Sequence, residues 1–337
     1  MLAQLLKRSR SFLALRKLGL LRSNQFVVLT YHRIADIAPQ EEYPFDEELI
    51  SASSSEFAWQ MEFLASNFRP EKLGTLLRMA NEGQKIPSGS VAVTFDDGFL
   101  DNYSVAEPIL QKYGVPATFF ITTDFVESNR PIWFEVVAFA FLTLPVGSIR
   151  YSLDVQAVPS QTVREVRLLE LNQALRKLKL LPDIERVSFV AYLLTLIDTA
   201  ALDAAWKKFG GAMQWAHVAE LARNGIEIGS HTVSHPILSK TQSSSMKAEL
   251  EDSKRKLEEV VGMPIDILAY PVGGRAQISP EVINLAEVAG YGFGVSYIPG
   301  VNRSGELDPF CVRRHTVERT LTRARFEAQL CMPSIFT

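Results

Sequence analysis

Cysteine is scarce in this sequence: Cys311 and Cys331 are the two thiols among 337 residues. Two cysteines so placed resemble neither the framework of a disulfide-rich domain nor the closely spaced pairs that bind structural zinc. We therefore expect two reduced structural thiols, with a disulfide between them as the alternative. This usage favours a reducing compartment.

An excess of basic residues is lacking too, since 35 Lys and Arg stand against 38 Asp and Glu and give a net charge of −3. Nucleic-acid-binding proteins usually carry a basic excess, so we expect no nucleic-acid partner. The chain is 47% hydrophobic and 22% charged, which are ordinary proportions for a globular protein with a large core.

Long apolar runs are absent as well. Basic side chains interrupt every apolar stretch in residues 1–23, so we expect neither a signal peptide nor a membrane-spanning helix there. This segment predicts a basic amphipathic helix, which either lies on an anionic membrane face or packs on its own domain. We expect a cytoplasmic protein, with peripheral contact at the inner membrane face as one outcome. The uncharged run Val136–Ser148 predicts a buried helix.

Short β-branched or apolar runs alternate with helical patterns from residue 26 onward. Strands that alternate with helices indicate parallel β-α units, and about seven of them predict a barrel or an open wound sheet within residues 24–337. The expected strands are Phe26–Tyr31, Ser90–Phe95, Ala117–Thr122, Ile226–Gly229, Ile265–Tyr270, Gly292–Ser296 and Cys311–Thr316. The expected helices between them include Glu56–Asn67, Trp215–Asn224 and Gln242–Val261.

Residues 129–213 interrupt this alternation with a mostly helical pattern. Helices are predicted at Val163–Leu178 and Ile184–Leu196, and one strand at Tyr151–Val155. We interpret the segment as a helical insertion between the third and fourth core strands. Loops at the carboxyl ends of strands are where such folds build their sites and accept insertions.

Two adjacent carboxylates, Asp96 and Asp97, follow the apolar run Val91–Phe95 and precede Gly98. Like charges held this close raise the pKa of one group unless a cation separates them. A metal that takes one aspartate while the other serves as a base would supply that cation. The alternative is an ordinary turn with an aspartate as a helix cap.

Two imidazoles, His231 and His235, stand four positions apart after the expected strand Ile226–Gly229. This spacing places both rings on one side of a helical turn, within reach of one ion. Two neutral imidazoles and one carboxylate leave open positions around a catalytic zinc ion. A chance pair is common, but this pair ends a strand as the aspartate pair does, so we expect one shared metal site.

The segments Thr94–Gly98 (TFDDG) and His231–His235 (HTVSH) resemble the first two signature motifs of the polysaccharide deacetylase family, the NodB-homology group of carbohydrate esterase family four. The resemblance covers roughly residues 25–320 without the insertion. It implies a distorted (β/α) barrel and the hydrolysis of an N-acetyl or O-acetyl group. By position, Asp96 would be the catalytic base, and Asp97, His231 and His235 would bind the metal.

The family's third motif usually reads Arg-Pro-Pro-Tyr-Gly, but here Leu268–Gly274 reads LAYPVGG. Ala269 stands where the family has the Arg that pairs with the base. The backbone N–H of Val272 could still donate to an oxyanion, since that role needs no side chain. Arg313 or Arg314, at the end of the last expected strand, could supply the missing cation, with a plain salt bridge as the alternative.

The general acid should come from His32, in the first expected strand (LTYHR). Its place ahead of the aspartate pair resembles the permuted motif order of the poly-N-acetylglucosamine deacetylases. A structural role for His32 and an acid role for His315 are the alternatives. Candidates for substrate contact are Tyr270, Pro271, Gly273 and Trp133. Trp215 and Asp124 could also touch the substrate, but core packing is the favoured role for both tryptophans and helix capping for Asp124. His217 suits a surface or capping role.

The resulting hypothesis is a metal-dependent hydrolase that removes N-acetyl groups from N-acetylated sugars or glycans and releases acetate. The donor set suits zinc, and Co²⁺, Ni²⁺ or Mn²⁺ could also occupy it. An O-acetyl esterase or small-molecule amide hydrolase with the same site is one alternative. A catalytically silent carbohydrate-binding scaffold is another, and the missing third-motif Arg favours it. Oligomeric state stays open.

Overall fold

The computed structural model describes residues 23–37, 42–149 and 163–333 of the chain. The amphipathic helix expected at residues 1–23 lies outside them except for its last residue. The expected strand Tyr151–Val155 lies outside them too. Both therefore stay predictions.

The main sheet has the strand order β10-β1-β5-β6-β7-β8-β9, with β11 beside β1 and β4 beside β5. Every pairing in it is parallel except that of β10 with β1. A second, small sheet pairs β2 with β3. The strands are β1 (Gln25–Tyr31), β2 (Arg33–Ile34), β3 (Ile50–Ala52), β4 (Arg69–Pro70), β5 (Ser90–Phe95), β6 (Ala117–Ile121), β7 (Glu227–Ser230), β8 (Ile267–Ala269), β9 (Phe293–Val295), β10 (Asn302–Arg303) and β11 (His315–Thr316).

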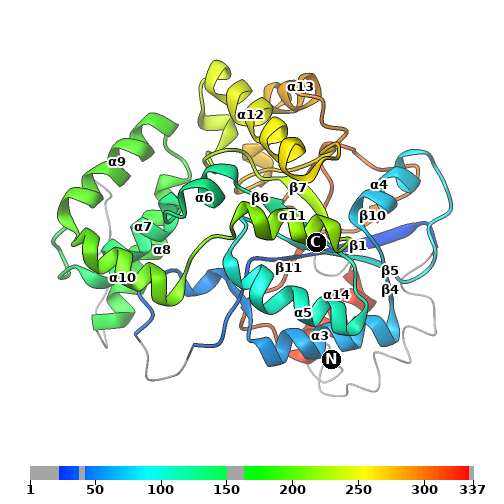
Figure 1. Cartoon of the computed structure of the whole chain (residues 1–337), viewed down its shortest axis with the longest axis horizontal. Coiled ribbons are helices and arrows are strands. Elements are labelled where there is room, and N and C mark those ends of the chain that lie inside the picture. The colour runs from blue at the N-terminus through cyan, green and yellow to red at the C-terminus, as the bar shows by residue number, and fades with distance from the viewer. Residues whose placement is uncertain (1–22, 38–41, 150–162, 334–337) are drawn as a thin grey trace.

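The two ends of this sheet come together through the last segment of the chain. Val312 bridges to Val295 of β9, and β11 pairs with β1, so the parallel strands curl around into a distorted barrel (Figure 1). The expected fold class is thus confirmed. The expected strand Cys311–Thr316 is wrong in its extent, because only His315–Thr316 is a strand. Asn302 bonds both backbone groups of Arg313 with its side chain and so interrupts the strand ladder.

Both faces of the central strands are buried, which explains their unbroken apolar sequences. Val27 and Leu29 of β1 point into the cluster under the outer helices, whereas Phe26 and Val28 point into a second cluster inside the barrel. At the carboxyl end of this inner side, the hydroxyls of Thr30 and Thr94 lie 2.9 Å apart and begin a polar layer. The barrel interior therefore changes from apolar to polar toward the edge that carries the expected site.

Outer helices cover the barrel, with α11, α12 and α13 on one side and α3, α5 and α14 on the other (Figure 1). The hydroxyl of Ser53 caps α3 by accepting from the N–H of Glu56, and Gly262 ends α12 in a left-handed conformation. The helices are α3 (Ser54–Asn67), α4 (Leu73–Asn81), α5 (Glu107–Tyr113), α6 (Thr123–Ser128), α11 (Trp215–Arg223), α12 (Ser243–Val261), α13 (Pro280–Val288) and α14 (Arg323–Cys331), with short turns η1 (Glu47–Leu49), η2 (Asn102–Ala106), η3 (Leu238–Lys240) and η4 (Arg275–Gln277).

The insertion between β6 and β7 forms a helical lobe at one end of the molecule (Figure 1). Its helices are α7 (Trp133–Thr143), α8 (Val163–Leu178), α9 (Asp183–Leu196) and α10 (Thr199–Phe209), so both helices predicted there are present. The lobe packs around a separate apolar cluster, which also includes Phe99 and Phe125 from outside the insertion, and nearly every residue of α7 is buried. Among the described residues no single helix could span a membrane, although the bent pair of α9 and α10 passes by length and composition. Cys311 and Cys331 form no disulfide with each other.

Candidate active site

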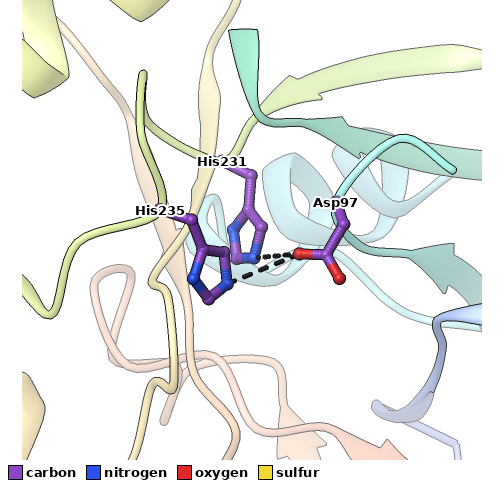
Figure 2. A group of neighbouring side chains, drawn as sticks. All are labelled: Asp97, His231 and His235. Carbon is purple, nitrogen blue, oxygen red and sulfur yellow. Dashed lines mark ion pairs between the residues drawn. The ribbon is translucent and has the colours of Figure 1, made fainter. Parts of the chain in front are cut away.

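Asp97, His231 and His235 converge at the carboxyl ends of β5 and β7 (Figure 2). The Nε2 atoms of both histidines lie 3.4 Å from Oδ1 of Asp97, and all three side chains are buried. The carbonyl of Ala269 lies 2.8 Å from Nδ1 of His231. If Nδ1 carries the proton, the lone pair of Nε2 points toward Asp97, as in metal-ligating histidines.

The loops that carry these residues adopt unusual backbone conformations. Asp97, Thr232 and His235 have φ values of 76°, 69° and 57°, in the left-handed region that residues other than Gly rarely adopt. Such strain costs on the order of 1–3 kcal/mol per residue and persists where the surroundings hold it in place. The strand-to-loop turns therefore direct the side chains at one another at a cost in stability.

The chemistry of this cluster fits a divalent cation. Both carboxylate oxygens of Asp97 are buried without a hydrogen-bond partner, although a buried carboxylate ordinarily has one. Burial lowers the pKa of His235 to about 3, which keeps its imidazole neutral and able to act as a ligand. Burial also disfavours a charge on His231, but the neighbouring carboxylates outweigh it and raise its pKa. The same negative potential would attract a metal ion.

Asp96 lies beside this cluster and is bound by Arg314. The Nη1 and Nη2 atoms of Arg314 donate to its two carboxylate oxygens at 2.7 and 2.8 Å, and both residues are buried. Burial favours a neutral Asp96, but the guanidinium outweighs it and holds the pKa of this carboxyl below its usual range. Of the two candidate arginines, Arg314 therefore supplies the cation, whereas Arg313 donates to the carbonyl of Pro299.

The third-motif segment lies at the carboxyl end of β8. Val272 lines the cleft described below with a φ of 65°, an uncommon value for a β-branched residue. Tyr270 also lines the cleft, but its ring is almost fully buried and its hydroxyl has no partner. Pro271 and Gly273 are not among the lining residues; Gly273 instead donates to the carbonyl of Pro271 and accepts from Tyr297.

The two candidate acids lie in different places. His32 lines the cleft together with Asp96 and Asp97, and burial lowers its pKa. His315 belongs to β11, is 1% exposed, and is not among the cleft residues. The structure therefore brings His32, and not His315, to the predicted metal site.

The cleft has a volume of about 770 Å³ and lies between the barrel and the helical lobe. Trp133 lines it, but its indole N–H donates to the carbonyl of His235 at 3.1 Å, so this residue also fixes a candidate metal ligand. Asp124, Trp215 and His217 are not part of the lining. His217 caps α11 through Nδ1, as one of its expected roles requires.

Sequence reasoning missed several lining residues. Leu171 and Asn172 come from α8, Lys179 directly follows that helix, and Tyr297 follows β9. Tyr297 stands at the carboxyl end of a parallel strand, a position that could have suggested it. The α8 residues carry no comparable signal, since their place in the cleft depends on how the lobe packs.

A distorted parallel barrel that carries a buried Asp-His-His cluster beside an ion-paired aspartate has the arrangement of groups that fits a hydrolytic site. The polysaccharide deacetylase family model matches residues 83–167 and 180–294, which is more than half of the chain. The chain therefore belongs to the polysaccharide deacetylase family, as the two motifs predicted.

Individual relatives are distant. YxkH of Bacillus subtilis (strain 168), which is named as a polysaccharide deacetylase, is 22% identical over 75% of this chain and 60% of its own length. The poly-β-1,6-N-acetyl-D-glucosamine N-deacetylase of Escherichia coli (strain K12) is 29% identical over 31% of this chain and 15% of its own length. The chain thus spans less than two thirds of these relatives.

Solved structures share the fold. The Streptococcus pyogenes deacetylase PplD, in complex with acetate, superposes with a TM-score of 0.59 at 18% identity, over 89% of this chain and 96% of that one. IcaB from Ammonifex degensii superposes with a TM-score of 0.56 at 18% identity, over 92% of this chain and 97% of that one. At these identities the likeness establishes the architecture alone.

Proposed function

We propose that this protein is a metal-dependent deacetylase that hydrolyses the N-acetyl groups of N-acetylated sugars or glycans. One observation carries the proposal: the buried Asp97, His231 and His235 cluster lies in the same cleft as the Arg314-paired Asp96. A divalent ion held there, with zinc the best match to the donors, would supply Lewis acidity toward a carbonyl and lower the pKa of water.

The residues of the chain divide the proton transfers between them. Asp96, kept ionised by Arg314, takes a proton from the water that attacks the acetyl carbon. The backbone N–H of Val272 donates to the oxygen on which negative charge develops. His32 then protonates the nitrogen as the C–N bond breaks, giving acetate and a free amine. An acid is required because an unprotonated amide anion is a very poor leaving group.

The pairing of Asp96 weighs against the scaffold alternative. That alternative drew on the absence of the third-motif arginine, and Arg314 provides a guanidinium at the same carboxylate from the segment before β11. An O-acetyl esterase would use the same residues but would depend less on the acid, because an alkoxide leaves more readily than an amide anion. The named activity of the Escherichia coli relative toward poly-β-1,6-N-acetyl-D-glucosamine supports the N-acetyl glycan as substrate class.

The test is acetate and primary-amine release from N-acetylglucosamine oligomers, with metal content measured on the same samples. Asp96→Asn should lose turnover by a factor on the order of 100 or more while it keeps its metal. The matched control is Asp124→Asn, because Asp124 follows the neighbouring strand β6, is exposed, and does not line the cleft. A chelator should abolish activity, and added Zn²⁺ should restore it.

Three outcomes would contradict the proposal. Full activity after complete metal removal would exclude the metal mechanism. Retained turnover in Asp96→Asn would show that the base is another group. Release of acetate from O-acetylated oligomers alone, without amine from N-acetylated ones, would replace the proposal with the esterase alternative.

A further inference from the structure

His32 occupies a break in the backbone between two strands. β1, a strand of the barrel sheet, ends at Tyr31, and β2, a strand of the small second sheet, begins at Arg33. His32 itself belongs to neither strand. Its backbone groups therefore need partners of another kind, since unbonded polar groups at a part-buried position cost free energy.

Side chains from two distant segments provide those partners. The hydroxyl of Ser51 accepts from the N–H of His32 at 2.9 Å, and the amide Nδ2 of Asn102 donates to its carbonyl at 2.6 Å. Asn102 is fully buried, whereas His32 is partly exposed, so this bond is part-buried. Both backbone groups of His32, its N–H and its carbonyl, are thus bonded by side chains.

Asp101, the neighbour of Asn102, holds the residues that follow His32. Its Oδ2 accepts from Nε of Arg33 at 2.9 Å, and its Oδ1 accepts from the N–H of Ile34 at 3.1 Å. Arg33 is buried and also donates to the hydroxyl of Tyr43 at 2.6 Å. A buried, fully bonded guanidinium of this kind fixes one geometry, because any displacement leaves a charge unpaired.

The segment that carries Asp101 and Asn102 is the continuation of the aspartate motif. Asn102 opens the π-helical turn η2, which begins a few residues after Asp96 and Asp97. π-Helical turns are rare and occur often at functional sites. Here the turn follows the loop of Asp96 and Asp97, and its first residue, Asn102, lies against the carbonyl of His32.

We propose that Asn102 and Asp101 are positioning residues for His32, so that one strand-end segment, residues 96–102, both supplies the base and a metal ligand and fixes the acid. The inference rests on the proposed function, in which His32 protonates the leaving amine. It adds a role for Asn102 and Asp101, which bond the backbone of His32 and Ile34 at the break between β1 and β2.

The test compares an amide with an activated ester in the same variants. An N-acetylglucosamine oligomer needs a proton on its leaving nitrogen, whereas 4-nitrophenyl acetate releases a stable phenolate that needs none. Asn102→Ala should lower kcat for the oligomer by a factor on the order of 10 or more and leave ester hydrolysis and metal content close to wild type. His32→Ala should show the same selectivity with a loss on the order of 100-fold or more.

Ser253→Ala is the matched control, since Ser253 is buried and hydrogen-bonded to Ser230 and Tyr291 but does not line the cleft. It should leave the amide-to-ester ratio unchanged. Ser51→Ala, which removes the other bond to His32, gives a second and milder variant, so the proposal stays testable if Asn102→Ala does not fold. It should lower the ratio by a few-fold.

The outcomes separate the two proposals. If His32→Ala lowers the amide-to-ester ratio but Asn102→Ala and Ser51→Ala do not, the positioning role is wrong and the proposed function stands. If Asn102→Ala lowers both activities equally, its role is structural and the inference is overturned. If His32→Ala leaves the ratio unchanged, His32 is not the acid, and the proposed mechanism fails together with the inference.

Discussion

Arg314 reaches Asp96 across the barrel interior and binds both of its carboxylate oxygens, at 2.7 and 2.8 Å. Arg314 precedes β11, Asp96 follows β5, and both strands pair with β1. The family motif would place an arginine at residue 269 on β8, where this chain has Ala269. The guanidinium of Arg314 lies 5.7 Å from the centre of the Phe120 ring, in the same inner cluster as Ala269. The small side chain of Ala269 and the guanidinium of Arg314 therefore lie in the same inner part of the barrel.

Arg314→Leu should impair both stability and catalysis. Removing one partner of a buried ion pair leaves the other charge unpaired, so the free energy of unfolding should fall by about 3 kcal/mol or more. The kcat for an N-acetylated oligomer should fall on the order of 100-fold, because Asp96 loses the group that orients and ionises it. Arg313→Leu is the neighbouring control and should stay close to wild type in kcat. Equal effects of the two substitutions would contradict the assigned pairing.

The double variant Ala269→Arg/Arg314→Ala tests whether an arginine on β8 can replace Arg314 as the cation beside Asp96. If charge and position alone matter, it should recover part of the activity that Arg314→Ala loses, by about tenfold over the single variant. The measurement is kcat for the same oligomer. The metal content of each variant checks that the loops of Asp97, His231 and His235 are intact. Recovery of stability without activity would show that Asp96 needs Arg314 in its present geometry.

Local sequence was sufficient for the buried central strands of the barrel and for the grouping of Asp97 with His231 and His235. Val27 and Leu29 belong to an unbroken apolar run that only a strand buried on both faces explains, and Asp97 follows such a run directly. The choice between Arg313 and Arg314 was beyond the sequence. It depends on Asn302, which holds the backbone of Arg313 and leaves the side chain of Arg314 to enter the barrel.

The lining residues from the helical lobe and the hydrogen-bond partners of His32 could not be predicted from the sequence either, for a related reason. Asn172 and Lys179 reach the cleft because the helical lobe packs beside the barrel, and Asn102 reaches His32 because η2 packs against β2. Neither set of contacts corresponds to a fixed spacing in the sequence. Contacts between segments about 70 residues or more apart follow from tertiary packing, which overrides local pattern.

Val272→Gly should preserve activity and not reduce stability by much. The proposed donor is the backbone N–H, which glycine retains, so kcat should stay within about threefold of wild type. Glycine adopts the observed φ of 65° without strain, which offsets its greater flexibility in the unfolded chain, so the free energy of unfolding should change by less than about 1 kcal/mol. Chemical denaturation and steady-state kinetics check both values. A large loss of kcat would instead assign the side chain of Val272 a direct role.

His315 should make the protein less stable in mild acid. Its imidazole is buried, and burial lowers its pKa to about 4, against about 6.5 in an unfolded chain. Between these two values the unfolded chain binds a proton that the folded chain does not, so this group's contribution to stability falls as the pH decreases from about 6.5 to about 4. The loss amounts to about 3 kcal/mol at the lower limit.

His315→Asn should remove that part of the pH dependence. The measurement is the free energy of unfolding from denaturant titrations between about pH 7.5 and pH 4, for wild type and variant in parallel. The stability of the variant relative to wild type should improve as the pH falls through this window, whatever its offset at neutral pH. His217→Asn, which removes an imidazole from the cap of α11, controls for the loss of a histidine elsewhere. A constant difference between wild type and His315→Asn across the window would show that His315 gains its proton equally well in the folded protein.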